Sequence, residues 1–193
     1  MDGFATRTAS GIRWASSLAC SLMVASAQGA TTGGPSQYEV TAAYLFNFSK
    51  FVEWPEGTFT GAADPIIICV LGENPFGTLL GDAVKGKQVN GREIVVRETS
   101  SISKIPGCHI VFLAPNEQER LDEALARLAD RPILTVSNAD SVAGRGAVIG
   151  LTLEERRVRF EVNLVAAGRA RLKLSSQLLK VAVRLIGQGD QRH

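Results

Sequence analysis

The side chains best suited to chemistry in this sequence are a cysteine and a histidine in adjacent positions, Cys108 and His109. A thiolate activated by an imidazole is the nucleophile of cysteine hydrolases. Here both residues open an apolar, strand-like run, and neighbours on a strand point to opposite faces, so the two side chains cannot meet. The chain has one other histidine and three cysteines in all, too few for the usual His/Cys zinc clusters. We predict no catalytic residue and no metal site.

A second candidate is the glycine and lysine spacing of residues 81–87, which matches the start of a phosphate-binding loop. Gln88 stands where that loop needs the Ser or Thr that holds magnesium. The loop must also follow a strand and open a helix, whereas here a turn and a strand come after it. The G-x-S-x-G and C-x-x-C motifs are missing from the sequence as well. We therefore expect no enzyme activity and no cofactor.

The first 27 residues have the pattern of a secretory signal. Arg7 and Arg13 precede an apolar run of small residues that closes with Ala25-Ser26-Ala27. The run is too short and too rich in serine for a membrane span. We predict cleavage after Ala27 and an exported protein; a lipoprotein attached at Cys20 is the alternative.

Two cysteines, Cys69 and Cys108, remain after this cleavage. Disulfides persist in an oxidising compartment, so an exported chain with two cysteines favours a bond between them. Each cysteine lies in or beside an apolar strand-like run, and adjacent strands can bring two such residues within bonding distance. The alternative is a pair of buried free thiols.

Residues 38–55 form the most aromatic segment of the chain and end at Trp54-Pro55. Apolar side chains recur at helical spacing and Pro55 blocks continuation, so we expect an amphipathic helix that begins near Tyr38. Core packing is the simpler role for its aromatic face. The alternative is that part of the face binds a partner, since aromatic residues also dominate interfaces. The predicted helical face comprises Val40, Ala43, Tyr44, Phe48, Phe51 and Val52, and the candidate partner-binding residues are Tyr44, Phe48, Phe51, Trp54, Phe59 and Phe76.

The rest of the chain alternates strand and helix patterns. Strands are expected at residues 66–71, 93–97, 109–113, 133–136, 147–153 and 157–164. Helices are expected at residues 117–129, with Asn116 as the cap, and at 175–186, capped by Ser175 or Ser176.

This alternation predicts an α/β fold: a three-layer sandwich with a mostly parallel, mixed sheet and helices on both faces. Strands 147–153 and 157–164 should form a C-terminal antiparallel hairpin, because only a short polar connector separates them. We expect a flexible mature N-terminus over residues 28–37, one domain over 38–187 and a frayed tail over 188–193. The formal net charge of +2 gives no bias toward nucleic acid.

Several blocks of the sequence, taken in order, resemble the YfiR family of bacterial periplasmic regulators. The first is the aromatic segment Y-x-V-x-A-A-Y-L-F-N-F-x-K-F-V-E-W-P. The others are IIICVLGENPFG, GKQVNGREIVVR, CHIVFL, ILTVSN and RVRFEVNLVAAGRARLKLSSQLLKVA. Together they cover almost the whole mature chain.

The resemblance implies a periplasmic, non-enzymatic protein that represses an inner-membrane diguanylate cyclase by contact with its periplasmic domain, and so lowers cyclic di-GMP and biofilm formation. It also implies the Cys69–Cys108 pairing, and an outer-membrane lipoprotein that sequesters the repressor. A homodimer is a further possibility for such a protein. The rival hypothesis is a periplasmic module that binds a small molecule and acts on another membrane sensor.

Overall fold

The computed structural model describes residues 35–105, 107–114 and 118–187. These ranges include the whole of the predicted domain 38–187 except residues 106 and 115–117. The predicted signal segment, residues 28–34 of the predicted flexible stretch, the predicted cap Asn116 and the predicted tail 188–193 lie outside the described residues.

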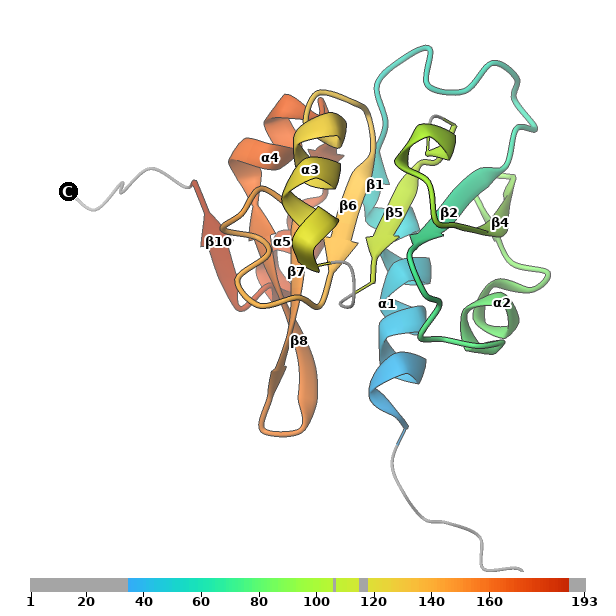
Figure 1. Cartoon of the computed structure of the whole chain (residues 1–193). Coiled ribbons are helices and arrows are strands. Elements are labelled where there is room, and N and C mark those ends of the chain that lie inside the picture. Colours follow the sequence, from blue (N-terminus) through green and yellow to red (C-terminus); the bar gives the residue numbers. More distant parts are fainter. Residues whose placement is uncertain (1–34, 106, 115–117, 188–193) are drawn as a thin grey trace, which may run out of the picture. The chain divides into compact units, whose positions relative to one another are not determined.

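An eight-stranded sheet forms the middle layer, with the strands in the order β10-β8-β7-β6-β5-β2-β4-β3 (Figure 1). Its strands β2, β4, β5, β6 and β7 run parallel, whereas β3 and β8 are antiparallel to their neighbours β4 and β7, and β10 is parallel to β8. The mostly parallel, mixed sheet with a C-terminal hairpin was predicted from the sequence and is confirmed. The strand bounds are β2 Ile66–Leu71, β3 Gln88–Val89, β4 Arg92–Thr99, β5 Ile110–Leu113, β6 Leu134–Ser137, β7 Ile149–Glu154, β8 Arg157–Asn163 and β10 Arg184–Ile186.

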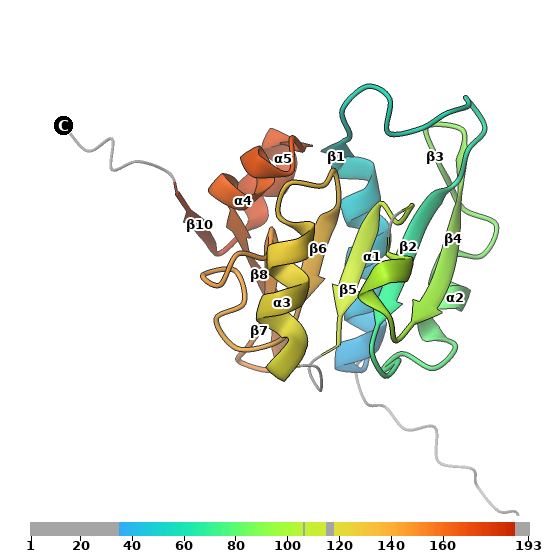
Figure 2. The same cartoon turned by 45° about the horizontal axis from the view of Figure 1, so that its top comes forward.

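Helices cover both faces of this sheet (Figure 2). The buried side chains form two separate cores. One core lies between the sheet and four helices: α1 (Gln37–Phe51), α2 (Leu79–Val84), α4 (Leu164–Arg169) and α5 (Ser176–Val181). The other lies beneath α3 (Gln118–Leu128) and the short 3-10 helix η1 (Ile102–Lys104). A small two-stranded sheet, β1 (Val52–Glu53) with β9 (Lys173–Leu174), continues α1. The predicted three layers are therefore present.

Helix α1 begins with a capping box. The hydroxyl of Ser36 accepts a hydrogen bond from the amide of Glu39, and the carboxylate of Glu39 accepts one from the amide of Ser36. Gln37, which was predicted to belong to the flexible stretch, is the first helical residue. The helix ends before Val52, whose extended backbone opens β1.

The buried face of α1 differs from the predicted one. Its most buried residues include Thr41 and Ser49, while Ala43 is exposed. The two hydroxyls donate to the carbonyl oxygens of Gln37 and Phe46, so burial leaves neither without a partner. A prediction from the spacing of apolar residues does not count buried polar residues such as these as part of the core. The predicted buried face therefore differs from the observed one by a rotation about the helix axis.

The C-terminal helix predicted over residues 175–186 is confirmed at its start, where the hydroxyl of Ser175 caps it by accepting from the amide of Leu178, but its predicted end is wrong. Helix α5 ends at Val181, Ala182 is extended, and β10 pairs in parallel with β8. This pairing supplies hydrogen-bond partners for backbone groups at the outer edge of β8. A continued helix at residues 184–186 would leave those groups without them. Helix α4, which was not predicted, is capped at its start by Asn163, whose side chain accepts from the amide of Ala166.

Candidate functional site

The described residues hold no obvious reaction centre. They contain no group of three or more His, Cys, Asp or Glu side chains that could hold a metal ion. Within the same ranges, no helix has the length and apolar character needed to cross a membrane. The candidate functional sites of the described residues are therefore their exposed apolar and charged surfaces.

An apolar groove of about 390 Å³ lies between α1 and α5. Aromatic rings from α1 and β8 form much of its lining, and Val181 at the end of α5 is 63% exposed. An apolar side chain left so open to water beside a hollow is typical of an interaction surface. The groove is lined by Tyr44, Asn47, Phe48, Phe51, Phe160, Gln177, Leu178 and Val181.

Tyr44 is held rigidly at one end of this groove. Its hydroxyl donates to the carbonyl oxygen of Val158 in β8 at 3.2 Å. Its ring stacks on Phe48 at 5.6 Å between centroids, and meets the edge of Phe160 at 5.5 Å. The wall of the groove is therefore preorganised, which lowers the entropic cost of binding a partner.

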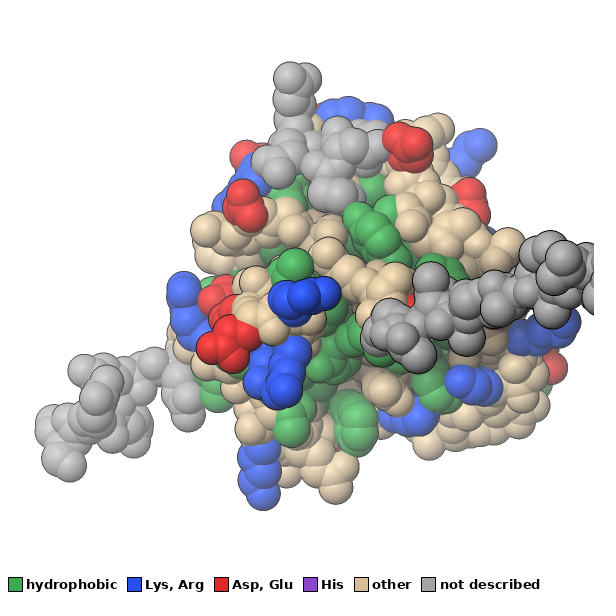
Figure 3. Space-filling view, turned by 90° about the horizontal axis from the view of Figure 1, so that it is seen from below, with side chains coloured by type: hydrophobic (Ala, Val, Ile, Leu, Met, Phe, Trp, Pro, Cys, Tyr) green, Lys and Arg blue, Asp and Glu red, His purple; other side chains and the backbone are tan. Residues whose placement is uncertain are grey.

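A second hollow, of about 520 Å³, opens on the other side of Tyr44, between α1 and the β7–β8 hairpin. Its apolar floor includes Val40 and Val158, and three arginines border it: Arg156, Arg157 and Arg159. None of the three forms an ion pair with a described residue. Figure 3 shows this side of the molecule, where both basic and acidic side chains border a hydrophobic area.

Another aromatic cluster, Trp54, Phe59 and His109, gathers beyond the end of α1. His109 stacks on Phe59, and the indole of Trp54 donates to the carbonyl oxygen of His109 at 3.3 Å. The guanidinium of Arg92 lies 3.9 Å above the Phe59 ring and donates to the carbonyl oxygens of Gly61 and Asp64. The cluster fastens the loop between β1 and β2 to the sheet.

His109 is buried and neutral. Burial first, and then the positive charges of Arg92 and Arg97, lower its pKa from 6.5 to about 4, against the opposing effect of Asp64. Its Nδ1 accepts a hydrogen bond from the amide of Ile67 at 3.0 Å, which requires an unprotonated Nδ1. The imidazole is thus part of the structure, and Cys108 beside it is occupied in a disulfide.

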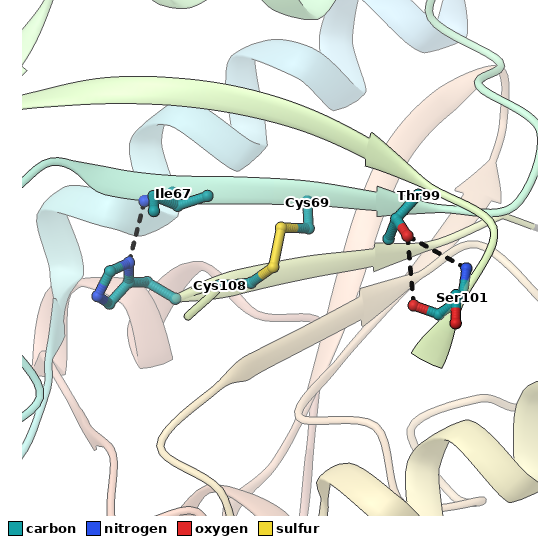
Figure 4. The surroundings of a disulfide bond; sticks show 6 residues. Ile67, Cys69, Thr99, Ser101 and Cys108 are labelled. Carbon is teal, nitrogen blue, oxygen red and sulfur yellow. Dashed lines mark hydrogen bonds between the residues drawn. A yellow bond between two sulfur atoms is a disulfide. The ribbon is translucent and has the colours of Figure 1, made fainter. Parts of the chain in front are cut away.

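That disulfide joins Cys69 in β2 to Cys108 just ahead of β5, with a Cα–Cα distance of 5.9 Å (Figure 4). Both residues belong to the core beneath α3. The disulfide and the α1–α5 groove therefore lie on opposite faces of the sheet.

The structure separates the six aromatic residues that we proposed as a partner site. Tyr44, Phe48 and Phe51 line the groove, whereas Trp54 and Phe59 belong to the cluster around His109. Phe48 and Phe76 are only 1% and 2% exposed, so their place as exposed anchors is corrected: they are core residues. Phe76 packs between Tyr38 and Phe112.

Sequence reasoning missed the groove residues that come from the second half of the chain. Phe160 was predicted on a strand and Val181 inside a helix, but nothing in their spacing placed them against α1. No role in the site was predicted for the arginines at the hairpin. Their proximity to Val40 and Tyr44 arises from the long-range packing of α1 on β8.

Comparison with known proteins agrees with this fold. A family model described as YfiR/HmsC-like matches residues 38–183. Among solved structures, the chain is similar to a conserved domain protein from Vibrio cholerae O1 biovar El Tor str. N16961, with a TM-score of 0.53 and 12% sequence identity. The match covers 78% of this chain and 60% of that one, so the chain spans about 60% of the length of that protein. At this identity the likeness is one of fold alone.

Proposed function

Because the chain belongs to the YfiR/HmsC-like family, whose members are periplasmic regulators of diguanylate cyclase signalling rather than enzymes, we propose that it represses a membrane cyclase. It does so by protein–protein contact with the periplasmic domain of an inner-membrane diguanylate cyclase. The outcome is less cyclic di-GMP and less biofilm. Residues 1–27 direct export and are removed.

The α1–α5 groove is the observation that most supports this function. A repressor must bind the inactive conformation of its target more tightly than the active one, because a ligand shifts an equilibrium only by its differential affinity. A rigid apolar groove beside an exposed Val181 offers such a contact. Phe51 and Tyr44 are its partly accessible aromatic anchors.

An outer-membrane lipoprotein is proposed as a second partner that sequesters the repressor and so releases the cyclase. A homodimer would use the same kind of apolar surface. Nucleic acid is not a proposed partner, because the formal net charge of the sequence is only +2.

The test combines capture with a cellular measurement. The mature, oxidised protein is used to capture proteins from solubilised inner membrane, and cyclic di-GMP is measured in cells that lack the gene. Recovery of a diguanylate cyclase together with a rise in cyclic di-GMP on deletion supports repression. Unchanged nucleotide and no cyclase would reject it.

Two valines provide a matched pair of variants for this test. Val181→Asp places a charge in the groove, whereas Val165→Asp changes a valine of α4, 56% exposed, that does not line it. We expect Val181→Asp to lose the cyclase and Val165→Asp to keep it. Equal behaviour of the two variants would remove the groove from the proposal.

The alternative function, binding of a small molecule, has its own supporting observation. The parallel strands lie in the order β4-β2-β5-β6-β7, the 2-1-3-4-5 order of doubly wound sheets, which bind ligands beyond the carboxyl ends of their strands. At that edge, directly after β6, Oδ1 of Asn138 is buried and makes no hydrogen bond to a described residue. A saturable thermal shift with a metabolite, lost in Asn138→Ala, would favour this function.

A further inference from the structure

The groove and the arginine-lined hollow are two parts of one surface, and we propose that this surface binds a partner segment with an acidic side chain beside apolar ones. The apolar side chains occupy the α1–α5 groove and the carboxylate occupies the hollow. The inference rests on the proposed protein–protein function and adds to it the chemistry of the partner.

Tyr44 connects the two parts, because its side chain lines both the groove and the hollow. One ligand can therefore reach both over the width of a single aromatic ring. With its hydroxyl bound to Val158 and its ring against Phe48 and Phe160, Tyr44 does not need to move to admit it.

The charge of the hollow indicates which group it accepts. Other arginines nearby have partners: Arg184, for instance, contacts Glu161 at 3.3 Å. Arg156, Arg157 and Arg159 have no ion-pair partner among the described residues. All three arginines border the hollow, and a carboxylate is the group that accepts paired N–H donors from a guanidinium.

The described acidic side chains near the hollow form no ion pair with its arginines. The carboxylate of Glu39 accepts from the amide of Ser36 in the capping box. Across the hairpin, Glu154 stands opposite Arg157 in the strand register but forms no ion pair with it. No acidic side chain of the described residues therefore occupies the N–H donors of these three arginines in an ion pair.

The hairpin turn that carries Arg156 has a strained backbone. Glu155 and Arg156 both have positive φ, 48° and 63°, in a two-residue turn of the kind that favours Asn-Gly. A side chain in this conformation costs about 1 kcal/mol or more. Residues held in such backbone are concentrated at functional sites, and here the strain places an arginine at the rim of the hollow.

The chain ahead of Pro35 does not supply the occupant. Residues 28–34 contain no carboxylate and no large apolar side chain, and Asp2 is the only acidic residue ahead of Pro35. A second copy could offer Leu153, Glu154 and Glu155 from its own hairpin. We favour a partner protein because the proposed function requires one, and sedimentation of the arginine variants distinguishes it from self-association.

The test uses the mature, oxidised chain and three fluorescent peptides that share one amphipathic leucine pattern. Their polar positions carry Glu, Gln or Lys. Anisotropy titrations at ~50 mM and ~500 mM salt should show the Glu peptide binding at least about tenfold tighter than the Gln peptide, and the Lys peptide weakest. The preference should shrink at the higher salt, because exposed charges are then screened.

Charge reversal then locates the effect. Arg157→Glu with Arg159→Glu should abolish or invert the preference, while Val181→Asp should weaken binding of the Glu and Gln peptides alike. The control is Lys104→Glu, which alters an exposed charge of η1 on the opposite face of the sheet. Urea unfolding checks that each variant is folded.

Several outcomes would overturn the proposal. The first is equal binding of the Glu and Gln peptides, and the second is that Lys104→Glu changes the preference as much as the arginine substitutions do. The third is displacement of the peptide by succinate alone. The fourth is that the arginine variants convert a dimer to a monomer in sedimentation. The last two would assign the hollow to a small dicarboxylate or to a second copy.

The peptide test and the capture experiment can fail separately. Capture of a cyclase without any preference among the peptides leaves repression standing and rejects the acidic segment. A clear preference without a captured cyclase keeps the surface and rejects the cyclase as its partner.

Discussion

The imidazole of His109 lies parallel to the phenyl ring of Phe59, with 4.4 Å between ring centroids and 11° between the planes. Trp54 meets both rings edge-on, and Arg92 covers the other face of Phe59. This stack links the loop before β2 to the start of β5. It therefore makes the charge of one buried imidazole important for the stability of this end of the domain.

Acidification should destabilise the protein through His109. Its pKa is about 4 when folded, below the ordinary 6.5, so the unfolded chain binds the proton more readily. The contribution of His109 is fully present above pH 6.5, falls as the pH drops toward 4, and levels off below. Between about pH 7.5 and about pH 5 we expect a loss of about 2 kcal/mol. Urea unfolding of wild type and of His109→Gln at both pH values measures it; parallel pH dependence in the two proteins would contradict it.

Arg92 should control both the loop and the pKa of His109. Arg92→Gln removes two hydrogen bonds of 2.8 Å to Gly61 and Asp64 and the cation over Phe59, so we expect faster proteolysis within residues 57–64. It also removes a charge that lowers the pKa of His109, which should rise in an NMR titration. Arg97→Gln is the control: it should raise that pKa without exposing the loop to protease.

Reduction of the Cys69–Cys108 disulfide should lower stability by about 3–4 kcal/mol, because the bond closes a loop with a sequence separation of 39. Urea unfolding with and without dithiothreitol measures this difference. The double variant Cys69→Ala with Cys108→Ala should have the stability of the reduced wild type, and dithiothreitol should not change that stability. Equal stability of oxidised and reduced wild type would show that the bond has no stabilising role.

Removing the unfavourable backbone conformation of the hairpin turn should stabilise the protein and weaken its binding of the Glu peptide. Glu155→Asn with Arg156→Gly suits the positive φ values at both positions, and we expect a gain of about 1–2 kcal/mol in the free energy of unfolding. The Glu peptide should bind this variant less tightly, since Arg156 borders the hollow. Glu155→Ala with Arg156→Ala, which keeps the unfavourable backbone, should show no comparable gain.

Truncation should distinguish buried aromatic residues from the exposed Val181 of the groove. Phe48→Ala and Phe76→Ala remove fully buried rings and should each cost about 3–5 kcal/mol in chemical denaturation. Val181→Ala, at an exposed position, should change stability by less than about 0.5 kcal/mol. A small loss from Phe48→Ala would show that its ring is not packed as described.

The elements predicted best from the sequence are those in which buried apolar residues recur at regular spacing within a short segment. The apolar run at residues 66–71 became β2, buried at every position, and the leucines of residues 117–129 became α3 beneath the sheet. Local patterns sufficed there because each element buries one continuous set of side chains. The pattern of residues 175–186 was equally regular, but only its first part is helical. Residues 184–186 instead pair with the edge of β8, and the local sequence does not show that this edge lacks a partner.

The candidate site was predicted only in part for the same reason. Tyr44 and Phe51 stood out because the aromatic segment is unusual in composition. The arginine-lined hollow could not be predicted, because Val40 and Arg157 are distant in sequence and meet only through the packing of α1 on β8. Likewise Trp54 meets His109 only once β5 has joined the sheet.

The packing of α1 against β8 and α5 also bears on how the chain folds. A polypeptide is made from its N-terminus, so the aromatic helix exists well before residues 158–181 are available to cover it. Contacts between such distant segments form slowly, because the intervening chain must first be ordered. During that interval Phe48 and its neighbours remain open to water and to other chains. We therefore expect refolding yields to fall with protein concentration, and a holding chaperone to be needed during maturation.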